Sequence, residues 1–350
     1  MNNKRSNPLT FIALVFMIVL TGCQSPASIG TGPHSTSVNS GDGWETASPT
    51  AESLPSDKQI VLGFSQLGSE SDWRKANTLS IHAAAEEAGI DLVFANAEQS
   101  QAKQFDAIHS FIDQKVDVIA IAPVIQYGWE PILKEVKQAG IPVILFDRSV
   151  EVSDTSLFVT LIGSDFYEEG RKAGKYLLDK MRDRTEPAGI VELQGTVGSA
   201  PSVERGKGFH EVVKEREPLI MLGSEPANFT KEEGKKVMSS FLKEHGKDIH
   251  VLFSHNDDMA LGAIEAIEEY GLEAGKDIII ISVDGTKQAF EKMAEGKINC
   301  IVECNPLLGP HLMQAVKELM EGRTLPKRIV PTESVFTEEM AKKEVGNRKY

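Results

Sequence analysis

Charged and hydrogen-bonding side chains follow several apolar runs of the sequence directly. Carboxylates and amides accept or exchange hydrogen bonds with hydroxyl groups, and guanidinium groups donate in planar pairs. Trp73 adds a flat apolar ring, which can cover the C–H face of a sugar, and Phe64 or Phe229 offers a second one. The polar and charged residues at these positions are Glu70, Ser71, Asp72, Arg74, Asp147, Arg148, Arg205, Asn256 and Asp284.

This chemistry indicates binding rather than catalysis. The residues offer no nucleophile–base pair and no metal cage, so the chain is expected to be no enzyme and to need no cofactor or metal. A glycoside hydrolase needs two carboxylates about 5–10 Å apart, and Glu70 and Asp284 are available. Neighbouring arginines would hold such carboxylates ionised, which disfavours a general acid. The residue types favour a neutral polyol, in particular a monosaccharide.

Alternating strand and helix patterns from Lys58 onward must position these residues. The strands are apolar throughout, which is typical of parallel sheets covered by helices on both faces. Ligands of open α/β sheets bind beyond the carboxyl ends of the strands, where the polar residues stand. The alternation is too long for one six-stranded sheet, which leaves two doubly wound domains or a barrel. Strands are expected at Ile60–Ser65, Ile90–Ala95, Val116–Ala122, Ile141–Phe146, Phe158–Gly163, Ile190–Gln194, Ile249–Ser254 and Ile278–Val283.

The first 57 residues indicate export. Lys4 and Arg5 precede an apolar run, Phe11–Leu20, that is shorter than the roughly 20 residues of a membrane-spanning helix, and small residues follow it. Cys23 directly after them resembles a bacterial lipobox, so residues 1–22 are expected to be a lipoprotein signal peptide and Cys23 the lipidated first residue. An ordinary signal peptide with an incidental cysteine is the alternative. Residues 23–57 are rich in Ser, Thr, Pro and Gly and predict a disordered tether.

Net charge excludes several classes of partner. The chain carries 51 acidic and 37 basic residues, a net charge of −14. Nucleic acids and anionic membrane surfaces are bound by clustered Lys and Arg, so neither is expected as a partner. Contact with a membrane is expected through the lipid on Cys23 only, on the extracellular or periplasmic side.

Several segments together resemble the periplasmic sugar-binding proteins of ribose/galactose-type ABC importers, and most of all the galactofuranose-binding members. They are VLGFSQLGSESDWR, IAPVIQYGWEPILKEVK, IPVILFDRS, VELQGTVGSAPSVERGKGF, HNDDMALGAI and SVDGTKQAF. The resemblance implies a type I periplasmic binding protein fold, with two doubly wound parallel-sheet α/β domains, three hinge crossovers and a ligand cleft between the domains. The implied domains are 58–164 plus about 305–333, and 165–304 plus about 334–350.

The resemblance also implies which residues bind the sugar. They are Glu70, Ser71, Asp72, Trp73, Arg74, Asp147, Arg148, Arg205, Phe229, Asn256 and Asp284, with Phe229 as a ring-packing aromatic. Asp72 stands where the galactofuranose-binding relative has glycine, and Asn305, beside Cys304, stands near a threonine-type position; both departures bear on which sugar is preferred. The implied partners are a monosaccharide, an ABC permease and its ATPase, with the protein acting as a monomer. The alternative is a sugar-sensing receptor that presents its ligand to a membrane histidine kinase or a chemoreceptor.

Three further patterns have simpler explanations. Asp257 and Asp258 precede a helix, where capping and dipole interactions favour acidic residues. His245, His250 and His255 recur every five residues, but a glycine-containing turn and a strand separate them, which disfavours a metal site. Cys300 and Cys304 lie on a predicted strand, about 13 Å apart, which is beyond disulfide reach and predicts two free thiols.

Overall fold

The structure is a computed structural model that describes residues 59–214 and 216–350. The predicted signal peptide, Cys23 and the predicted tether lie outside the described residues. Within the described ranges no helix has the length and apolar character needed to cross a membrane.

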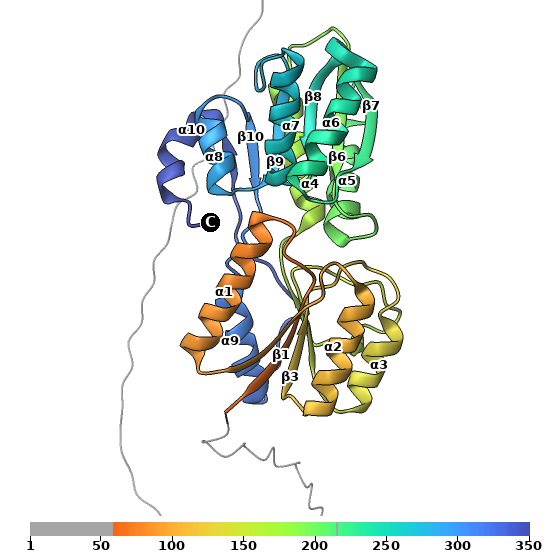
Figure 1. The fold of residues 1–350 in the computed structure, drawn as a ribbon, viewed down its shortest axis with the longest axis vertical. Helices are drawn as coiled ribbons and strands as arrows, with labels where there is room; N and C mark the ends of the chain where they lie inside the picture. The colour runs from red at the N-terminus through yellow and green to blue at the C-terminus, as the bar shows by residue number, and fades with distance from the viewer. Residues whose placement is uncertain (1–58, 215) are drawn as a thin grey trace, which may run out of the picture. The chain divides into compact units, whose positions relative to one another are not determined.

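Two six-stranded sheets organise the described chain, and each is the centre of one domain (Figure 1). The N-domain sheet has the order β11 (Arg328–Ile329), β5 (Thr160–Ile162), β4 (Val143–Phe146), β3 (Val118–Ile121), β1 (Val61–Gln66) and β2 (Asp91–Asn96). The C-domain sheet has the order β12 (Val335–Thr337), β10 (Cys300–Glu303), β9 (Ile279–Asp284), β8 (Ile249–Ser254), β6 (Ala188–Gln194) and β7 (Leu219–Pro226). Both sheets are open, so the barrel alternative is wrong.

Helices cover both faces of each sheet, because the central strands carry apolar side chains on both sides. In the N-domain, α1 (Asp72–Ala88) and α9 (Gly309–Met320) share one apolar core with the sheet, and α2 (Gln101–Gln114) and α3 (Glu130–Gln138) share the other. In the C-domain, α4 (Phe166–Lys180) and α5 (Ala200–Val213) cover one face, and α6 (Lys231–His245), α7 (Asp257–Tyr270), α8 (Lys287–Ala294) and α10 (Glu338–Glu344) the other. Short 3₁₀ turns occupy Thr155–Leu157, Gly246–Asp248 and Val345–Asn347.

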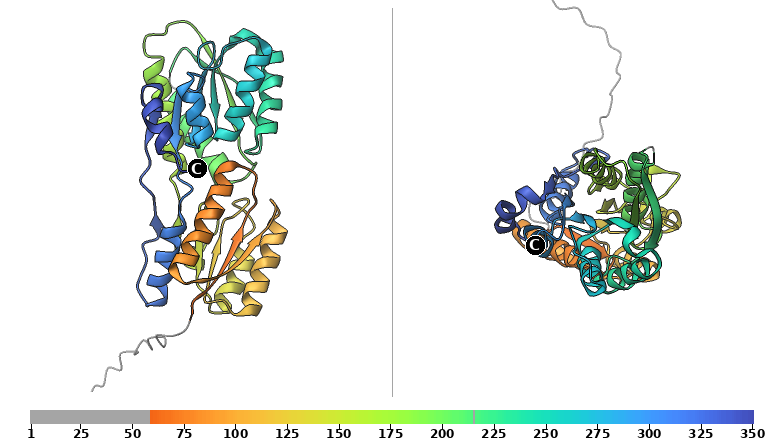
Figure 2. Two further views of the ribbon diagram at one scale, coloured as in Figure 1. Left: turned by 60° about the vertical axis from the view of Figure 1, so that its left-hand side comes forward. Right: turned by 90° about the horizontal axis from the view of Figure 1, so that it is seen from above.

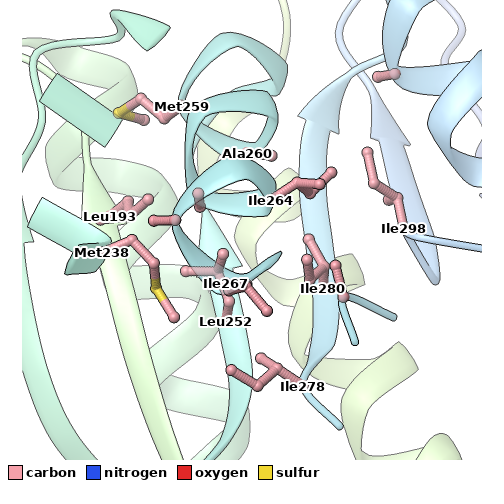
Figure 3. Packing of buried hydrophobic residues seen from close by; sticks show 14 of the residues in the cluster. Leu193, Met238, Leu252, Met259, Ala260, Ile264, Ile267, Ile278, Ile280 and Ile298 are labelled. Carbon is pink, nitrogen blue, oxygen red and sulfur yellow. The ribbon is translucent and has the colours of Figure 1, made fainter. Parts of the chain in front are cut away.

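The C-domain core shows how this packing works (Figure 3). Met238 of α6 and Ile264 and Ile267 of α7 lie against Leu252 and Ile280, which project from the central strands β8 and β9. Burying side chains of this size contributes about 1.5–3 kcal/mol each. This core holds α7 and β9 in fixed positions, and two of the cavity residues described below stand at the ends of these elements.

The chain passes between the two sheets three times, after β5, after β10 and after β11. The third passage is visible in the late, blue part of the chain (Figure 2). The carboxylate of Glu333, in the third crossover, accepts hydrogen bonds from Ser164 Oγ (2.5 Å) in the first and from the Asn305 N–H (2.8 Å) in the second. The predicted fold class is therefore confirmed: two doubly wound domains joined by three crossovers.

Some elements differ from the sequence prediction. The sheets were expected to be parallel, and among the described strands they are so except at one edge, where β12 pairs with β10 in the antiparallel direction. The edge strand β7 was not predicted; its residues are half-exposed or exposed, and its apolar run, Leu219–Leu222, is short. The helices α8, α9 and α10 were likewise not predicted.

Candidate functional site

A cavity of about 290 Å³ lies between the carboxyl ends of the two sheets. Loops and helix starts from both domains line it, as the predicted sheet topology requires. Its size suits a small molecule. The lining residues are Glu70, Ser71, Trp73, Arg74, Asp147 and Arg148 from the N-domain, and Phe166, Pro201, Arg205, Phe229, Asn256, Asp284 and Cys304 from the C-domain and its second crossover.

The structure brings ten of the eleven residues proposed from the sequence to this cavity, and Asp72 is the one that does not line it. Ser71 caps α1, so Asp72 begins the helix, and successive helical residues point about 100° apart. Trp73 and Arg74 face the cavity, whereas the Asp72 carboxylate accepts hydrogen bonds from Lys75 Nζ (2.8 Å) and from Gln288 Nε2 (2.9 Å) of the C-domain.

The N-domain half of the cavity is a chain of buried ion pairs. Arg74 Nη2 lies 2.5 Å from Asp147 Oδ2, and Arg74 Nε lies 3.4 Å from Glu70 Oε1. Arg148 lies farther from both carboxylates, at 3.6 Å from Asp147 and 4.0 Å from Glu70, and its Nε has no hydrogen-bond partner. Burial, and then the charge of Arg74, lower the pKa of Arg148 to about 10, so it remains charged at neutral pH.

The C-domain half is less completely paired. Arg205 donates through Nε to Glu169 Oε2 (2.7 Å) and through Nη1 to the His255 carbonyl (2.5 Å), but its Nη2 lies 3.9 Å from Asp284 Oδ1. Asp284 Oδ2 is buried without any hydrogen-bond partner. Burial raises the pKa of Asp284 well above its usual range. A buried carboxylate oxygen with no partner is costly, and a ligand that donates a hydrogen bond to it would remove that cost.

Three cavity arginines each stack on an aromatic ring, with their Cζ atoms 4.7–5.3 Å from the ring centroids. Their pairs are Arg74 with Trp73, Arg148 with Phe229 and Arg205 with Phe166. The second pair crosses between the domains. Rings beneath the guanidinium groups keep their planes fixed, and hydrogen-bond direction is fixed with them.

Three cavity residues have a backbone conformation, with positive φ, that residues other than glycine seldom adopt. The φ angles are 62° for Asp147, 62° for Phe229 and 124° for Asp284. Such strain persists only where the surroundings fix it, and it is typical of functional sites. Phe229 also depends on a glycine, because a Cβ at Gly195 would lie 1.8 Å from its ring.

Three lining residues were not predicted: Phe166, Pro201 and Cys304. Phe166 and Pro201 are apolar residues in the first turns of α4 and α5, and their types do not distinguish them from core residues. The carbonyl of Cys304 accepts a hydrogen bond from Trp73 Nε1 (2.6 Å), a contact between segments 231 residues apart that no local pattern indicates. Phe64, the alternative second aromatic, is instead buried in the N-domain core against Phe94 and Phe146.

Of the two roles predicted for Asp257, capping is wrong, whereas its place in the first turn of α7 agrees with an interaction with the helix dipole. Asn256 caps α7, since its Oδ1 accepts from the Met259 N–H (3.0 Å). Its amide nitrogen donates to the Phe229 carbonyl (3.2 Å), which holds the loop that carries the Phe229 ring. Asp257 instead points into the protein and bonds to the turn after β9.

His255, Cys300 and Cys304 are all buried. His255 is buried with Nε2 2.8 Å from Glu192 Oε1, and within the described ranges no group of potential metal ligands includes it, His245 or His250. Cys300 and Cys304 are both buried and free, as predicted.

One cluster of potential metal ligands occurs in the described part of the chain: Glu169, Cys304 and Glu333. Arg205 already holds Glu169, and Ser164 and Asn305 hold Glu333. Burial raises the pKa of the Cys304 thiol well above its usual range. A protonated thiol beside a guanidinium group is a poor environment for a cation.

The fold and the cavity together define a two-domain solute-binding protein whose ligand site lies between its domains. Residues 62–324 match the sequence family described as periplasmic binding protein domain, and the chain belongs to that family.

Individual relatives agree with this assignment. The galactofuranose-binding protein YtfQ of Escherichia coli (strain K12) is 41% identical over 293 residues, which is 83% of this chain and 92% of the relative. A Mycobacterium smegmatis protein solved in complex with β-D-fucofuranose is 49% identical, with a TM-score of 0.81 over 83% of this chain and 95% of that one. The periplasmic component of the arabinose ABC transporter from Shewanella sp. ANA-3, bound to α- and β-L-arabinofuranose, is 46% identical, with a TM-score of 0.80 over 83% of this chain and 96% of that one. The family resemblance stated from the sequence is thereby confirmed.

Proposed function

We propose that this protein captures a monosaccharide in its furanose ring form outside the cytoplasm and delivers it to the permease and ATPase of an ABC importer. The observation that carries the proposal is a pair of buried polar atoms without protein partners at one cavity. Arg148 Nε comes from the N-domain, and Asp284 Oδ2 comes from the C-domain. A hydroxyl group can accept from the first and donate to the second.

This arrangement explains how a sugar would close the cleft. In an open form, water satisfies Arg148 and Asp284 separately. In the closed form both are buried, and each unpaired group costs about 1–3 kcal/mol unless a ligand pairs with it. A sugar therefore stabilises the closed form over the open one by its differential affinity for the two. The permease would recognise the closed form.

The furanose class is supported by the relatives. The three proteins compared above, at 41–49% identity, have names or bound ligands that specify galactofuranose, fucofuranose or arabinofuranose. The cavity is small, which favours a single sugar ring over an oligosaccharide. Paired positive and negative groups favour a neutral ligand over a sugar phosphate or sugar acid.

The test is a titration of the purified protein, followed by calorimetry and thermal unfolding. D-galactose, L-arabinose, D-fucose and D-ribose are compared with methyl galactofuranoside and methyl galactopyranoside. We expect the furanoside to raise the melting temperature and the pyranoside to leave it unchanged, since only a ligand that binds the folded protein stabilises it. A protein that binds none of these sugars would contradict the proposal, and preference for the pyranoside would contradict the furanose class.

The cellular part of the proposal has its own tests. We propose that the protein acts as a monomer and is lipid-anchored through Cys23 on the outer side of the membrane, so Cys23→Ala should abolish incorporation of labelled palmitate. Deletion of the gene should abolish uptake of the labelled sugar. Normal uptake combined with loss of a sugar-dependent transcriptional or chemotactic response would favour the sensing alternative.

A further inference from the structure

A buried carboxylate outside the cavity connects two of the residues that line it. Asp257 is the first residue of α7, is fully buried and is not among the lining residues. It directly follows Asn256 in the chain, and its side chain reaches the turn that carries Asp284. Burying a carboxylate is costly unless its oxygens accept hydrogen bonds, so its partners show what it does.

The hydrogen bonds of the Asp257 carboxylate go to the end of β9 and to the turn that follows it. Its Oδ1 accepts from Ser282 Oγ (2.6 Å). Its Oδ2 accepts three bonds, from the Gly285 N–H (2.9 Å), from the Thr286 N–H (2.7 Å) and from Thr286 Oγ1 (2.9 Å). The donors stand on both sides of Asp284 in the sequence: the carboxylate binds the Ser282 side chain before it and the backbone N–H groups of Gly285 and Thr286 after it.

The turn needs this support because its backbone is strained. Asp284 has a φ of 124°, in a region that residues with a side chain rarely adopt, whereas Gly285, with a φ of 102°, adopts such values freely. A backbone hydrogen bond also runs from the Cys304 N–H to the Asp284 carbonyl (2.9 Å). Without Asp257, the turn can relax toward an unstrained conformation. The Asp284 carboxylate would then leave its position 3.9 Å from Arg205.

We propose that Asp257 is a positioning residue for ligand binding: its carboxylate holds the strained turn that aims Asp284 into the cavity, without touching the ligand. The inference rests on the proposed function, since it concerns affinity for the sugar. It gives a binding role to an acidic residue whose place at the start of a helix has a simpler explanation in the sequence.

Two substitutions separate the hydrogen bonds from the charge. Asp257→Ala removes all four bonds, and we expect affinity for D-galactose and L-arabinose, measured by calorimetry, to fall about tenfold or more. Asp257→Asn keeps an oxygen for Gly285 and Thr286, and its amide can donate to Ser282 Oγ. We therefore expect Asp257→Asn to retain affinity close to that of the wild type.

A cycle of variants tests whether Asp257 acts through Asp284. The effect of Asp257→Ala on sugar affinity is measured in the wild type and in an Asp284→Asn background. Asp284→Asn removes the carboxyl group but keeps a polar amide at that position. If Asp257 only positions Asp284, its loss should matter less in the second background. A purely structural role would reduce affinity by the same factor in both.

Met238→Ala is the control for a loss of stability, since it removes a fully buried side chain of the C-domain core (Figure 3). This variant is expected to lose stability and keep its sugar affinity at a temperature where it remains folded. Wild-type affinity in Asp257→Ala would overturn the inference, as would an equal loss of affinity in Met238→Ala. A wild type that binds none of the tested sugars would instead contradict the proposed function, so the two failures are distinguishable.

Discussion

The two halves of the cavity differ in how their buried charged groups are paired. In the N-domain half, Arg74 pairs with Asp147 and Glu70, and both carboxylates have partners before any ligand arrives. In the C-domain half, Arg205 donates hydrogen bonds to Glu169 and to a backbone carbonyl, and one oxygen of Asp284 has no hydrogen-bond partner. The first half therefore has both carboxylates paired and leaves only Arg148 Nε for a ligand, whereas the second leaves a carboxylate oxygen of Asp284 that depends on a ligand. We infer that N-domain contacts orient the ligand and that C-domain contacts drive closure.

The largest expected effect comes from removing one carboxylate in each half. Asp147→Ala leaves Arg74 buried without its 2.5 Å partner, so the ligand-free protein should lose about 3–5 kcal/mol of unfolding free energy. Asp284→Ala removes an unpaired buried carboxylate, so the ligand-free protein should be as stable as the wild type or more so. Both variants should lose sugar binding. Urea unfolding and calorimetry measure the two quantities, and an equal loss of stability in both variants would remove the distinction between the halves.

A smaller effect is expected from Gly195→Ala, which tests the C-domain half without changing a charge. The added Cβ would overlap the ring of Phe229, which must then leave its place beneath Arg148. Overpacking of this kind costs about 1–3 kcal/mol, and here the cost should appear as weaker sugar binding. Gly346→Ala is the control, since no atom lies within 4 Å of its added Cβ. Unchanged affinity in Gly195→Ala would show that the ring position is not needed.

A pH dependence is also expected at the edge of the cleft, where the two domains meet. The Asp72 N–H of the N-domain lies 3.2 Å from Asp258 Oδ2 of the C-domain. Burial, and then the charge of the Asp72 carboxylate, raise the pKa of Asp258 to about 7. On opening, the pair separates and the pKa should return toward its usual value of about 4.

The closed form then binds more protons than the open form, so acid favours closure. Sugar affinity should be highest below about pH 4, fall as the pH rises toward about 7, and level off above it. Calorimetric titrations from pH 5 to pH 8 measure this slope. Asp258→Asn should flatten it, whereas Asp91→Asn, at an exposed position far along the N-domain sheet, should not. An unchanged slope in Asp258→Asn would assign the pH dependence to other groups.

The residues that sequence patterns located are those whose position follows from a strand. Asp147, Arg148 and Asp284 stand at strand ends, and parallel sheets bring such ends to one edge. The predictions that failed concern the direction of a side chain on a helix or a contact between residues far apart in the sequence. Asp72 misses the cavity by one helical position, and the Cys304 carbonyl meets Trp73 only after the chain has completed most of both domains. The role of Asp257 depends on a turn whose strain no residue type reveals.

The three crossovers have a consequence for the order in which this protein is made. Helix α9 completes the N-domain core, and Leu308, Leu312 and Val316 are buried in it beside residues of α1 and the sheet. A ribosome delivers those residues only after it has synthesised β6 to β10 of the C-domain. The first domain to emerge therefore waits, with one face partly uncovered, until the second has emerged almost whole. The C-domain in turn is completed only by β12 and α10, which follow β11, so both domains are finished only near the end of the chain.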